Sequence, residues 1–546
     1  MNFIVRIQCF VLSVGLVIGG CASPTSQEQL SSQSATDKPN FLFIAVDDLN
    51  VYNTVLGDHE TSFLRKVYPD DSVRQSVIGR LTPNLQELAR QGVTFSNAYS
   101  AAPLCGPSRT ALLTGVPPHV SGYYQHDRHF RAYSSLTDTV TLPQYLKQNG
   151  YFTSGIGKVF HKGRSYLDRG YFSDWPDQIY SWSHWVEVNS GTSSQHDSVQ
   201  DNSEQLSRYW HNDGSKPAFT RFGVTQVPTE LSNDYLNASH IANLMVDGQA
   251  TRKDVNGQIQ QVVLPKEQPF FLAAGIFAPH LPWVVEQQYY DLFPLEEMAI
   301  DDELMAWLEW DARDLADSGK NLVSKSSFQD MLQYGLTLDG VGGDLNAWKA
   351  KFQAYLATIA YADRALGVLR EAIDRNPRRD NTIVVLWSDH GYHVGDKFRE
   401  GKITLWEAAN HANLLIIDPR REKNQTVESP VSLQDIYPTV VSLAGLGRPE
   451  HVYGEDLTDM LKQPQATRDR VILNTNGEGN HALRDLQYRY LRYANGDEEL
   501  YQMISDPLEQ INLAGLPAFE PILKKYRRAL EQELANPAGY HKTNQK

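Results

Sequence analysis

The chain has 546 residues, of which 41% are hydrophobic, so it is long enough to bury a large core in one main domain with an appendage. Its formal net charge of −15 at pH 7 argues against general nucleic-acid binding, which requires a basic surface. An anionic substrate would have to be held by a local basic pocket, because the field of the whole chain repels it.

The amino terminus is typical of an export signal followed by a lipid-attachment site. Residues 1–20 contain Arg6 and an apolar run that is too short to span a membrane. Ile18-Gly19-Gly20-Cys21 resembles a bacterial lipobox, which predicts that Cys21 is acylated and that a lipid anchor holds the exported protein at the outer membrane or in the periplasm. The alternative is a simple secretory signal and a soluble secreted protein. Residues 21–38, rich in Ser, Gln and Thr, are predicted to form a flexible tether.

Two continuous apolar runs, Asn40–Val46 and Asn381–Ser388, predict strands that are buried on both faces of a parallel sheet. The first run ends in Asp47-Asp48 and the second in Asp389-His390. Ligand sites of open parallel sheets lie at the carboxyl ends of the strands, so we expect these two clusters to meet. Three carboxylates and an imidazole suit a hard divalent cation, either calcium or magnesium.

The stretch Leu104–Gly115 is predicted to be a loop that enters a helix. Pro107 fits a first-turn position, because its missing N–H needs no partner there. Cys105 would then lie at the positive end of the helix, and Arg109 is one turn further on. This placement suits an anion together with a reactive side chain, but a lone Cys is most often an inert core residue, so the position alone leaves both interpretations open. No intrachain disulfide is expected, because Cys9 would leave with the signal and Cys21 would be acylated.

Two further apolar runs, Tyr151–Gly157 and Pro269–Phe277, also deliver chemical groups to the ends of predicted strands. Lys158 and His161 follow the first run, and His280 follows the second. Each His taken alone is more often an ordinary loop residue. Four strand ends that all carry such groups predict one shared site.

Stretches with apolar residues at helical spacing, including Pro83–Gly92 and Trp348–Arg375, predict helices on both faces of an α/β sheet. Leu486–Tyr501 has the pattern of an antiparallel hairpin with an Asn-Gly turn, and a helix is predicted over Glu520–Asn536. The predicted division is a catalytic domain over residues 39–450 and a smaller α+β subdomain over residues 451–546.

The run Cys105–Arg109, followed by Leu113-Thr114-Gly115, resembles the signature of type I, formylglycine-dependent sulfatases. The similarity extends over roughly residues 39 to 515 and is nearest to the iduronate-2-sulfatase-like branch, through the phrases Gly157–His161, Pro279–Pro282 and Ser388–Gly391. It implies an alkaline-phosphatase-like fold, with a large, mixed, mostly parallel sheet flanked by helices and a small C-terminal subdomain that carries an antiparallel sheet.

The resemblance also implies a modified residue and a bound metal. A formylglycine-generating enzyme, or an anaerobic sulfatase-maturating enzyme, would convert Cys105 to Cα-formylglycine, whose hydrated aldehyde attacks the sulfate ester. The implied metal is calcium, with magnesium left open by the residue types. Its implied ligands are Asp47, Asp48, Cys105, Asp389 and His390.

The reaction that follows is hydrolysis of a sulfate monoester on a carbohydrate. Lys158 and Lys402 would bind sulfate oxygens, and Arg109 would stabilise the charged hydrated aldehyde. His280 would protonate the leaving sugar oxygen, and His161 would accept the proton whose loss expels sulfate. Lys402 is chosen on the resemblance alone, and Lys397 and Arg399 are nearby competitors.

Three other functions stay open, one of which is an arylsulfatase that prefers small synthetic esters. A phosphatase or phosphodiesterase of the same superfold would usually offer Ser or Thr, not Cys105, as the nucleophile. A non-catalytic lipoprotein that binds sulfated glycans would keep Cys105 unmodified. Five residues in loop-like stretches are candidates for contact with the sugar, and the alternative is that they only line the rim of the pocket. They are Trp182, Trp185, Arg128, His129 and Arg131.

Overall fold

A computed structural model describes residues 38–161, 177–188, 209–211, 222–254, 256–325, 336–338, 344–468 and 470–535. The predicted signal, the lipobox and all of the predicted tether except Lys38 lie outside these residues. Among the helices that are described, none is both long and apolar enough to span a membrane.

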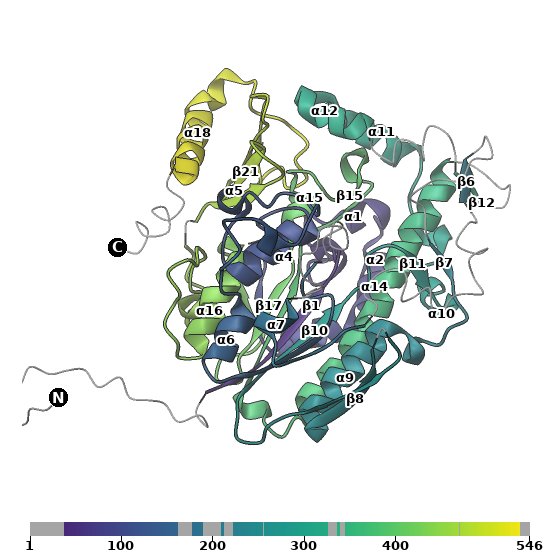
Figure 1. Ribbon diagram of the computed structural model, residues 1–546. Coiled ribbons are helices and arrows are strands. Elements are labelled where there is room, and N and C mark those ends of the chain that lie inside the picture. The colour runs from purple at the N-terminus through teal and green to yellow at the C-terminus, as the bar shows by residue number, and fades with distance from the viewer. Residues whose placement is uncertain are drawn as a thin grey trace, which may run out of the picture.

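An eight-stranded sheet forms the centre of the molecule, in the order β18-β2-β17-β13-β1-β10-β4-β5 (Figure 1). The five strands from β13 to β5 run parallel, whereas β17 is antiparallel to both of its neighbours. The sheet is therefore mixed and mostly parallel, as predicted. The strand bounds are β1 Asn40–Val46, β2 Val93–Phe95, β4 Phe152–Gly157, β5 His184–Val186, β10 Phe270–Ile276, β13 Thr382–Ser388, β17 Leu414–Ile417 and β18 Gln425–Val427.

Helices cover both faces of this sheet, which explains why its central strands are continuously apolar. All seven residues of β1 are buried, and its six apolar residues alternate between two hydrophobic clusters. Leu42, Ile44 and Val46 pack with α3 (Pro83–Arg90), α9 (Asn233–Asp247) and α14 (Asp344–Arg375). Phe41, Phe43 and Ala45 pack with α4 (Cys105–Thr114), α6 (Leu142–Gln148) and α16 (Ile436–Leu443). Figure 1 shows α9 and α14 on one side of β1 and β10, and α4, α6 and α16 on the other.

The strand register brings four strand ends to one edge of the sheet. Val46 pairs with Ser388 on one side and with Ile276 on the other, and Gly275 pairs with Gly157. The residues that follow each strand therefore emerge side by side at the edge where parallel sheets bind ligands.

Close approach of the backbone at Gly157 and Gly275 directs the chain into this edge. Gly157 has φ +79°, and a Cβ at this residue would lie 2.0 Å from the carbonyl oxygen of Gly275. A Cβ at Gly275 would in turn lie 2.2 Å from the amide nitrogen of Lys158. Only glycine fits both positions, and the turn at Gly157 places Lys158 beside the end of β10.

A four-stranded antiparallel sheet with one helix packed on it forms the C-terminal part. The hairpin predicted over Leu486–Tyr501 and the predicted terminal helix are both present in this part. Residues as far as Leu461 still pack in the core of the central sheet. The elements are β20 Ile472–Thr475, β21 His481–Arg484, β22 Tyr488–Arg492, β23 Glu498–Gln502 and α18 Glu520–Ala535.

Buried charged groups join this antiparallel sheet to the main body. Glu407 accepts hydrogen bonds from Arg484 at 3.2 Å, Arg489 at 3.0 Å and the hydroxyl of Tyr99 at 2.8 Å. Arg489 also donates to the carbonyl oxygen of Leu405 at 2.8 Å. The arrangement fixes the antiparallel sheet against the segment that follows the end of β13.

The remaining strands and helices of the described residues are mostly short and lie in the connections. The strands are β3 Ala98–Tyr99, β6 Tyr209–His211, β7 Phe222–Val224, β8 Gln249–Lys253, β9 Ile259–Val263, β11 Trp283–Val285, β12 Leu336–Leu338, β14 His393–Val394, β15 Glu400–Gly401, β16 His411–Ala412 and β19 Val431–Ser432. The helices are α1 Leu64–Val67, α2 Asp71–Leu81, α5 Pro118–Ser121, α7 Gln178–Ser181, α10 Gln287–Tyr290, α11 Asp302–Asp311, α12 Asp317–Ser324, α15 Glu407–Asn410 and α17 Thr458–Lys462.

Candidate active site

Cys105 is the first residue of α4 and is buried where the four strand ends meet. Its Sγ accepts a hydrogen bond from Lys402 Nζ at 2.8 Å and lies 3.3 Å from His390 Nε2 and 3.8 Å from Asp48 Oδ1. Burial raises the pKa of the thiol, but Lys158, Lys402 and His390 outweigh burial and hold that pKa well below its usual range. Position 105 therefore favours a negatively charged atom.

Arg109, one turn further along α4, connects three of the strand ends. Its Nε donates to Asp389 Oδ2 and its Nη2 to Asp47 Oδ1, both at 2.9 Å. Its Nη1 donates to the carbonyl oxygens of Lys158 and, at 3.1 Å, of Val159. These bonds fix α4 relative to β1, β4 and β13.

Asp47 and Asp389 share Arg109 but differ in how well their charges are compensated. Burial and Cys105 raise the pKa of Asp47, but Lys158 and Arg109 lower it further, so the net shift is downward. Burial is the dominant cause at Asp389 and raises its pKa to about 7 despite Arg109. The negative charge of Asp389 is thus the less well compensated of the two by the surrounding protein groups.

Asp48 is held in an uncommon backbone conformation. Its φ of 58° lies in the left-handed region, which few residues other than glycine adopt. Its amide donates to Asp389 Oδ1 at 3.1 Å, and its carbonyl accepts from the hydroxyl of Tyr355, on α14, at 2.8 Å. This local strain is stabilised at a position where the carboxylate faces Cys105.

The donor atoms at this edge fit a divalent cation. One oxygen of Asp48, one of Asp389, Cys105 Sγ and a ring nitrogen of His390 all lie within 4.8 Å of one another, and all four residues are buried. His390 Nδ1 is 2.8 Å from the carbonyl of Gly391, which only accepts, so Nδ1 carries a proton and Nε2 faces the cluster. Asp47 and His280 form a second such group with Asp48 and Cys105.

Two histidines approach this donor cluster from loops. His280 Nε2 is 3.8 Å from Asp48 Oδ2, and its Nδ1 lies 2.8 Å from the carbonyl oxygen of Leu281. His161 hydrogen-bonds to the Cys105 side chain, and burial lowers the pKa of its imidazole to about 4.

The structure brings all ten predicted site residues together at one edge of the sheet. They are Asp47, Asp48, Cys105, Arg109, Lys158, His161, His280, Asp389, His390 and Lys402.

Lys397 and Arg399, the alternatives to Lys402 as sulfate-binding residues, form contacts with other parts of the chain. Lys397 Nζ is 2.7 Å from Asp311 Oδ1, and Arg399 donates to the carbonyl of Leu322 at 2.7 Å.

Sequence reasoning missed His126, which also belongs to this site. Its ring packs against that of His161 with centroids 3.9 Å apart, and the two histidines form a third donor group with Cys105. Gly106 makes room for it, because a Cβ there would lie 2.8 Å from His126 Nδ1. His126 belongs to no motif and follows no predicted strand. The one sequence signal for it is the glycine at position 106, which leaves space for its ring.

At least two of the residues considered for sugar contact have structural roles. Trp182 is 3% exposed and packs against Trp185 and Phe271. Arg131 forms a two-pronged ion pair with Asp177 at 2.6 and 2.8 Å. These two side chains stabilise the loops beside the site. Of the other candidates, Arg128 lies over the ring of Tyr133 and is exposed, and His129 Nδ1 accepts from the amide of Arg131.

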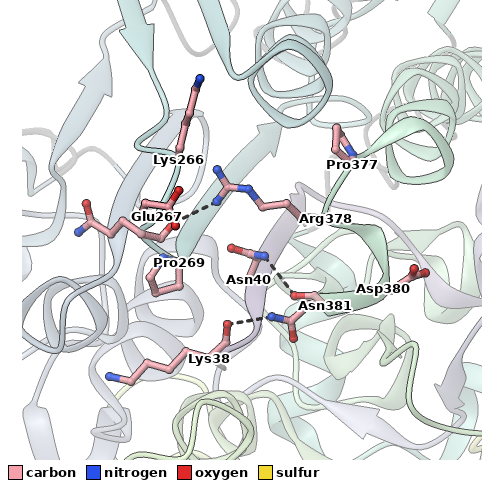
Figure 2. Close-up of a pocket in the computed structure, with 10 residues that line it drawn as sticks. Lys38, Asn40, Lys266, Glu267, Pro269, Pro377, Arg378, Asp380 and Asn381 are labelled. Carbon is pink, nitrogen blue, oxygen red and sulfur yellow. Dashed lines mark hydrogen bonds between the residues drawn. The ribbon is translucent and has the colours of Figure 1, made fainter. Parts of the chain in front are cut away.

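A cavity of about 290 Å³ lies at the opposite edge of the sheet, where β1, β10 and β13 begin (Figure 2). Several of its polar groups are already paired. Arg378 donates to the carbonyl of Gln268 at 3.0 Å, Asn381 to the carbonyl of Lys38 at 3.1 Å, and Asn40 to the carbonyl of Asn381 at 3.2 Å. The chemical groups are concentrated at the other edge, around Cys105.

Three curated relatives cover most of the chain. It is 33% identical over 505 residues to a sulfatase of Formosa agariphila, covering 91% of this chain and 88% of the relative. It is 26% identical to the iduronate 2-sulfatase of Mus musculus, covering 92% of this chain and 95% of the relative. It is 25% identical to an ulvan-active sulfatase of Formosa agariphila, covering 83% of this chain and 76% of the relative.

Two solved structures have the same fold over nearly the whole chain. One, in complex with its substrate D-glucosamine-2-N,6-O-disulfate, has a TM-score of 0.58 at 19% identity and covers 93% of this chain and 100% of its own. The other, a phosphonate monoester hydrolase from Silicibacter pomeroyi, has a TM-score of 0.67 at 20% identity and covers 91% and 96%.

The family model named Sulfatase matches residues 39–446, which include the ten predicted site residues. With this match and a relative that is 33% identical over 91% of the chain, the chain belongs to the sulfatase family and is a sulfuric ester hydrolase.

Proposed function

We propose that this protein removes sulfate from a sulfated carbohydrate, with residue 105 as the nucleophile after conversion of its Cys to formylglycine. The observation that carries the proposal is the position of Cys105 at the amino end of α4, in contact with Lys402, His390 and His161. The carbohydrate is supported by the relatives named iduronate 2-sulfatase and ulvan-active sulfatase, and by the fold neighbour solved with a disulfated glucosamine.

The cation that these donors fit would be calcium or magnesium, held by the two strand ends and residue 105. When bound, such an ion withdraws electron density from sulfate oxygens and favours an ionised hydroxyl at residue 105. Carboxylate ligands favour a hard cation, and the three carboxylates are Asp47, Asp48 and Asp389.

Residue 105 and the lysines bind and position the ester. The Sγ atom in the structure stands in for the hydroxyl oxygens that a hydrated formylglycine carries, one of which serves as the nucleophile. Lys402, which already contacts Sγ, and Lys158 would donate charge-assisted hydrogen bonds to sulfate oxygens. Arg109 would hold Asp47 and Asp389 in place and stabilise the charge that develops beside them.

Two histidines would move the protons. The side chain of His280 is 27% exposed, and its Nε2 would donate a proton to the leaving sugar oxygen. His161 would accept the proton of the second hydroxyl of residue 105, so that sulfate leaves and the aldehyde is restored. The two imidazoles thus serve the two halves of the reaction.

We also propose that Cys21 carries a lipid anchor and that the protein is exported. The support is the lipobox-like run Ile18–Cys21 and the Ser-, Gln- and Thr-rich residues 21–38 that follow it.

Cys105 should carry the modification and the activity. When the protein is made together with a formylglycine-generating enzyme, peptide mass spectrometry should show the mass loss of a thiol replaced by an aldehyde at residue 105. Cys105→Ala should lower kcat/KM by roughly 10³-fold or more, because it removes the nucleophile. A fully active protein with an unmodified Cys105, or faster turnover of the matched phosphate ester, would contradict the proposal.

Removal of the metal should abolish turnover reversibly. Dialysis against EDTA should reduce kcat to background, and added calcium should restore it with one ion per chain by elemental analysis. EGTA binds calcium more tightly than magnesium, so activity that returns when magnesium is added in the presence of EGTA would identify magnesium as the working ion, and no activity would identify calcium. Unchanged activity in metal-free protein would exclude the proposed site.

His280→Ala should affect poor leaving groups most. A sugar alcohol needs protonation as it leaves, whereas 4-nitrophenolate does not, so we expect losses of roughly 10²- to 10⁴-fold on the sugar sulfate and below about 10-fold on 4-nitrophenyl sulfate. The sugar sulfate is chosen as the best substrate in a panel of sulfated oligosaccharides. Equal losses on both substrates would remove the assignment of His280 as the acid.

Cys21→Ala should release the protein from the membrane. The wild-type chain, expressed in a bacterium with lipoprotein processing, should partition into the detergent phase, and the variant should be found in the aqueous fraction. A wild-type protein in the aqueous fraction would favour the simple secretory signal.

A further inference from the structure

A buried carboxylate on α9 holds the loop that carries His280. Asp234 lies in the first turn of α9 and is 3% exposed. Its Oδ1 accepts the amide hydrogen of Phe277 and its Oδ2 that of Ala278, both at 2.9 Å. The chain leaves β10 at this point, so one carboxylate satisfies two consecutive buried N–H groups that have left the sheet.

The same turn is fixed by further contacts that lead directly to His280. The amide of His280 donates to the carbonyl of Phe277 at 3.0 Å, and the Phe277 and His280 rings have centroids 4.8 Å apart. Trp283 Nε1 donates to the carbonyl of Pro279 at 2.6 Å. A movement of Phe277 would therefore be transmitted to the His280 ring.

We propose that Asp234 is a positioning residue for His280, which holds the turn so that the His280 imidazole faces Asp48 and the leaving oxygen. This inference rests on the acid role of His280 in the proposed function. The two oxygens of Asp234 bond to the backbone amides of Phe277 and Ala278, so it acts on His280 through the backbone of this turn.

The chain offers a matched control in Asp363 on α14. Asp363 is 2% exposed, and its two oxygens accept the amide hydrogens of the consecutive residues Asn84 and Leu85 at 2.9 and 2.8 Å. These bonds hold the first turn of α3, which carries none of the site residues. Asp→Asn at either position replaces an acceptor by an NH₂ group that faces an N–H, so the two variants should lose similar stability.

The test compares Asp234→Asn with Asp363→Asn in the matured, metal-loaded full chain. With the sugar sulfate chosen for His280→Ala, D234N should lower kcat by roughly 10- to 100-fold, since small displacements of a catalytic group have effects of this size. With 4-nitrophenyl sulfate D234N should lower kcat by less than about 3-fold. D363N should affect both substrates equally. Equal losses for D234N, or the same selective loss for D363N, would overturn the inference.

Two further measurements separate positioning from general damage. In the His280→Ala background D234N should cause no additional selective loss, whereas a full extra loss would show that Asp234 acts independently of His280. A crystal structure of D234N should show His280 displaced from Asp48, and an unmoved His280 would also overturn the inference. If D234N does not fold, Trp283→Phe removes another bond to the same turn and should show the same selectivity, and equal losses on both substrates would overturn the inference.

These outcomes are distinct from failure of the proposed function. A wild-type protein that hydrolyses no sulfate ester refutes the function itself, whereas an active wild type with a non-selective D234N refutes only the role of Asp234. The displacement of the turn in the D234N structure is measured without any substrate.

Discussion

The buried guanidinium of Arg109 is the contact on which the site depends. It is 1% exposed and bonds to two carboxylates and two carbonyl oxygens that come from three different strand ends. Removal of one partner of such a buried ion pair costs about 3–5 kcal/mol, because the remaining charge is left without compensation. Arg109 thus sets the position of α4, and with it that of residue 105, relative to Asp47 and Asp389.

Charge balance explains how a chain with a net charge of −15 can hold a sulfate ester. Asp47, Asp48 and Asp389 are opposed by three cationic groups, Arg109, Lys158 and Lys402. Conversion of Cys105 to an uncharged aldehyde would remove the thiolate from this set. A bound divalent cation would then make the site locally positive, which suits both an anionic ester and the negative charge that develops on the nucleophile.

The central strands, and the meeting of the groups that follow them at one edge, could be predicted because apolar runs mark buried strands and a parallel sheet aligns their ends. The chemical roles of these groups stay predictions. The choice of Lys402 over Lys397 needed the family resemblance, since both lysines lie in the same segment and only tertiary contacts separate them. His126 could not be predicted, because its place depends on packing against His161 from a loop. The pairing of Glu407 with Arg484 and Arg489 could not be predicted either, because it joins residues about 80 positions apart in the chain.

Lys158 and His280 lie on loops, yet the proposed chemistry requires them to be placed accurately. Charged residues from the two faces of the sheet resolve this conflict. From one face Arg109 on α4 donates to the carbonyls of Lys158 and Val159. From the other face Asp234 on α9 accepts from the amides of Phe277 and Ala278. A cation binds buried backbone acceptors after β4 and an anion binds buried backbone donors after β10, so each loop has backbone groups fixed by a rigid helix. Loops held in this way can present Lys158 and His280 as firmly as strands would.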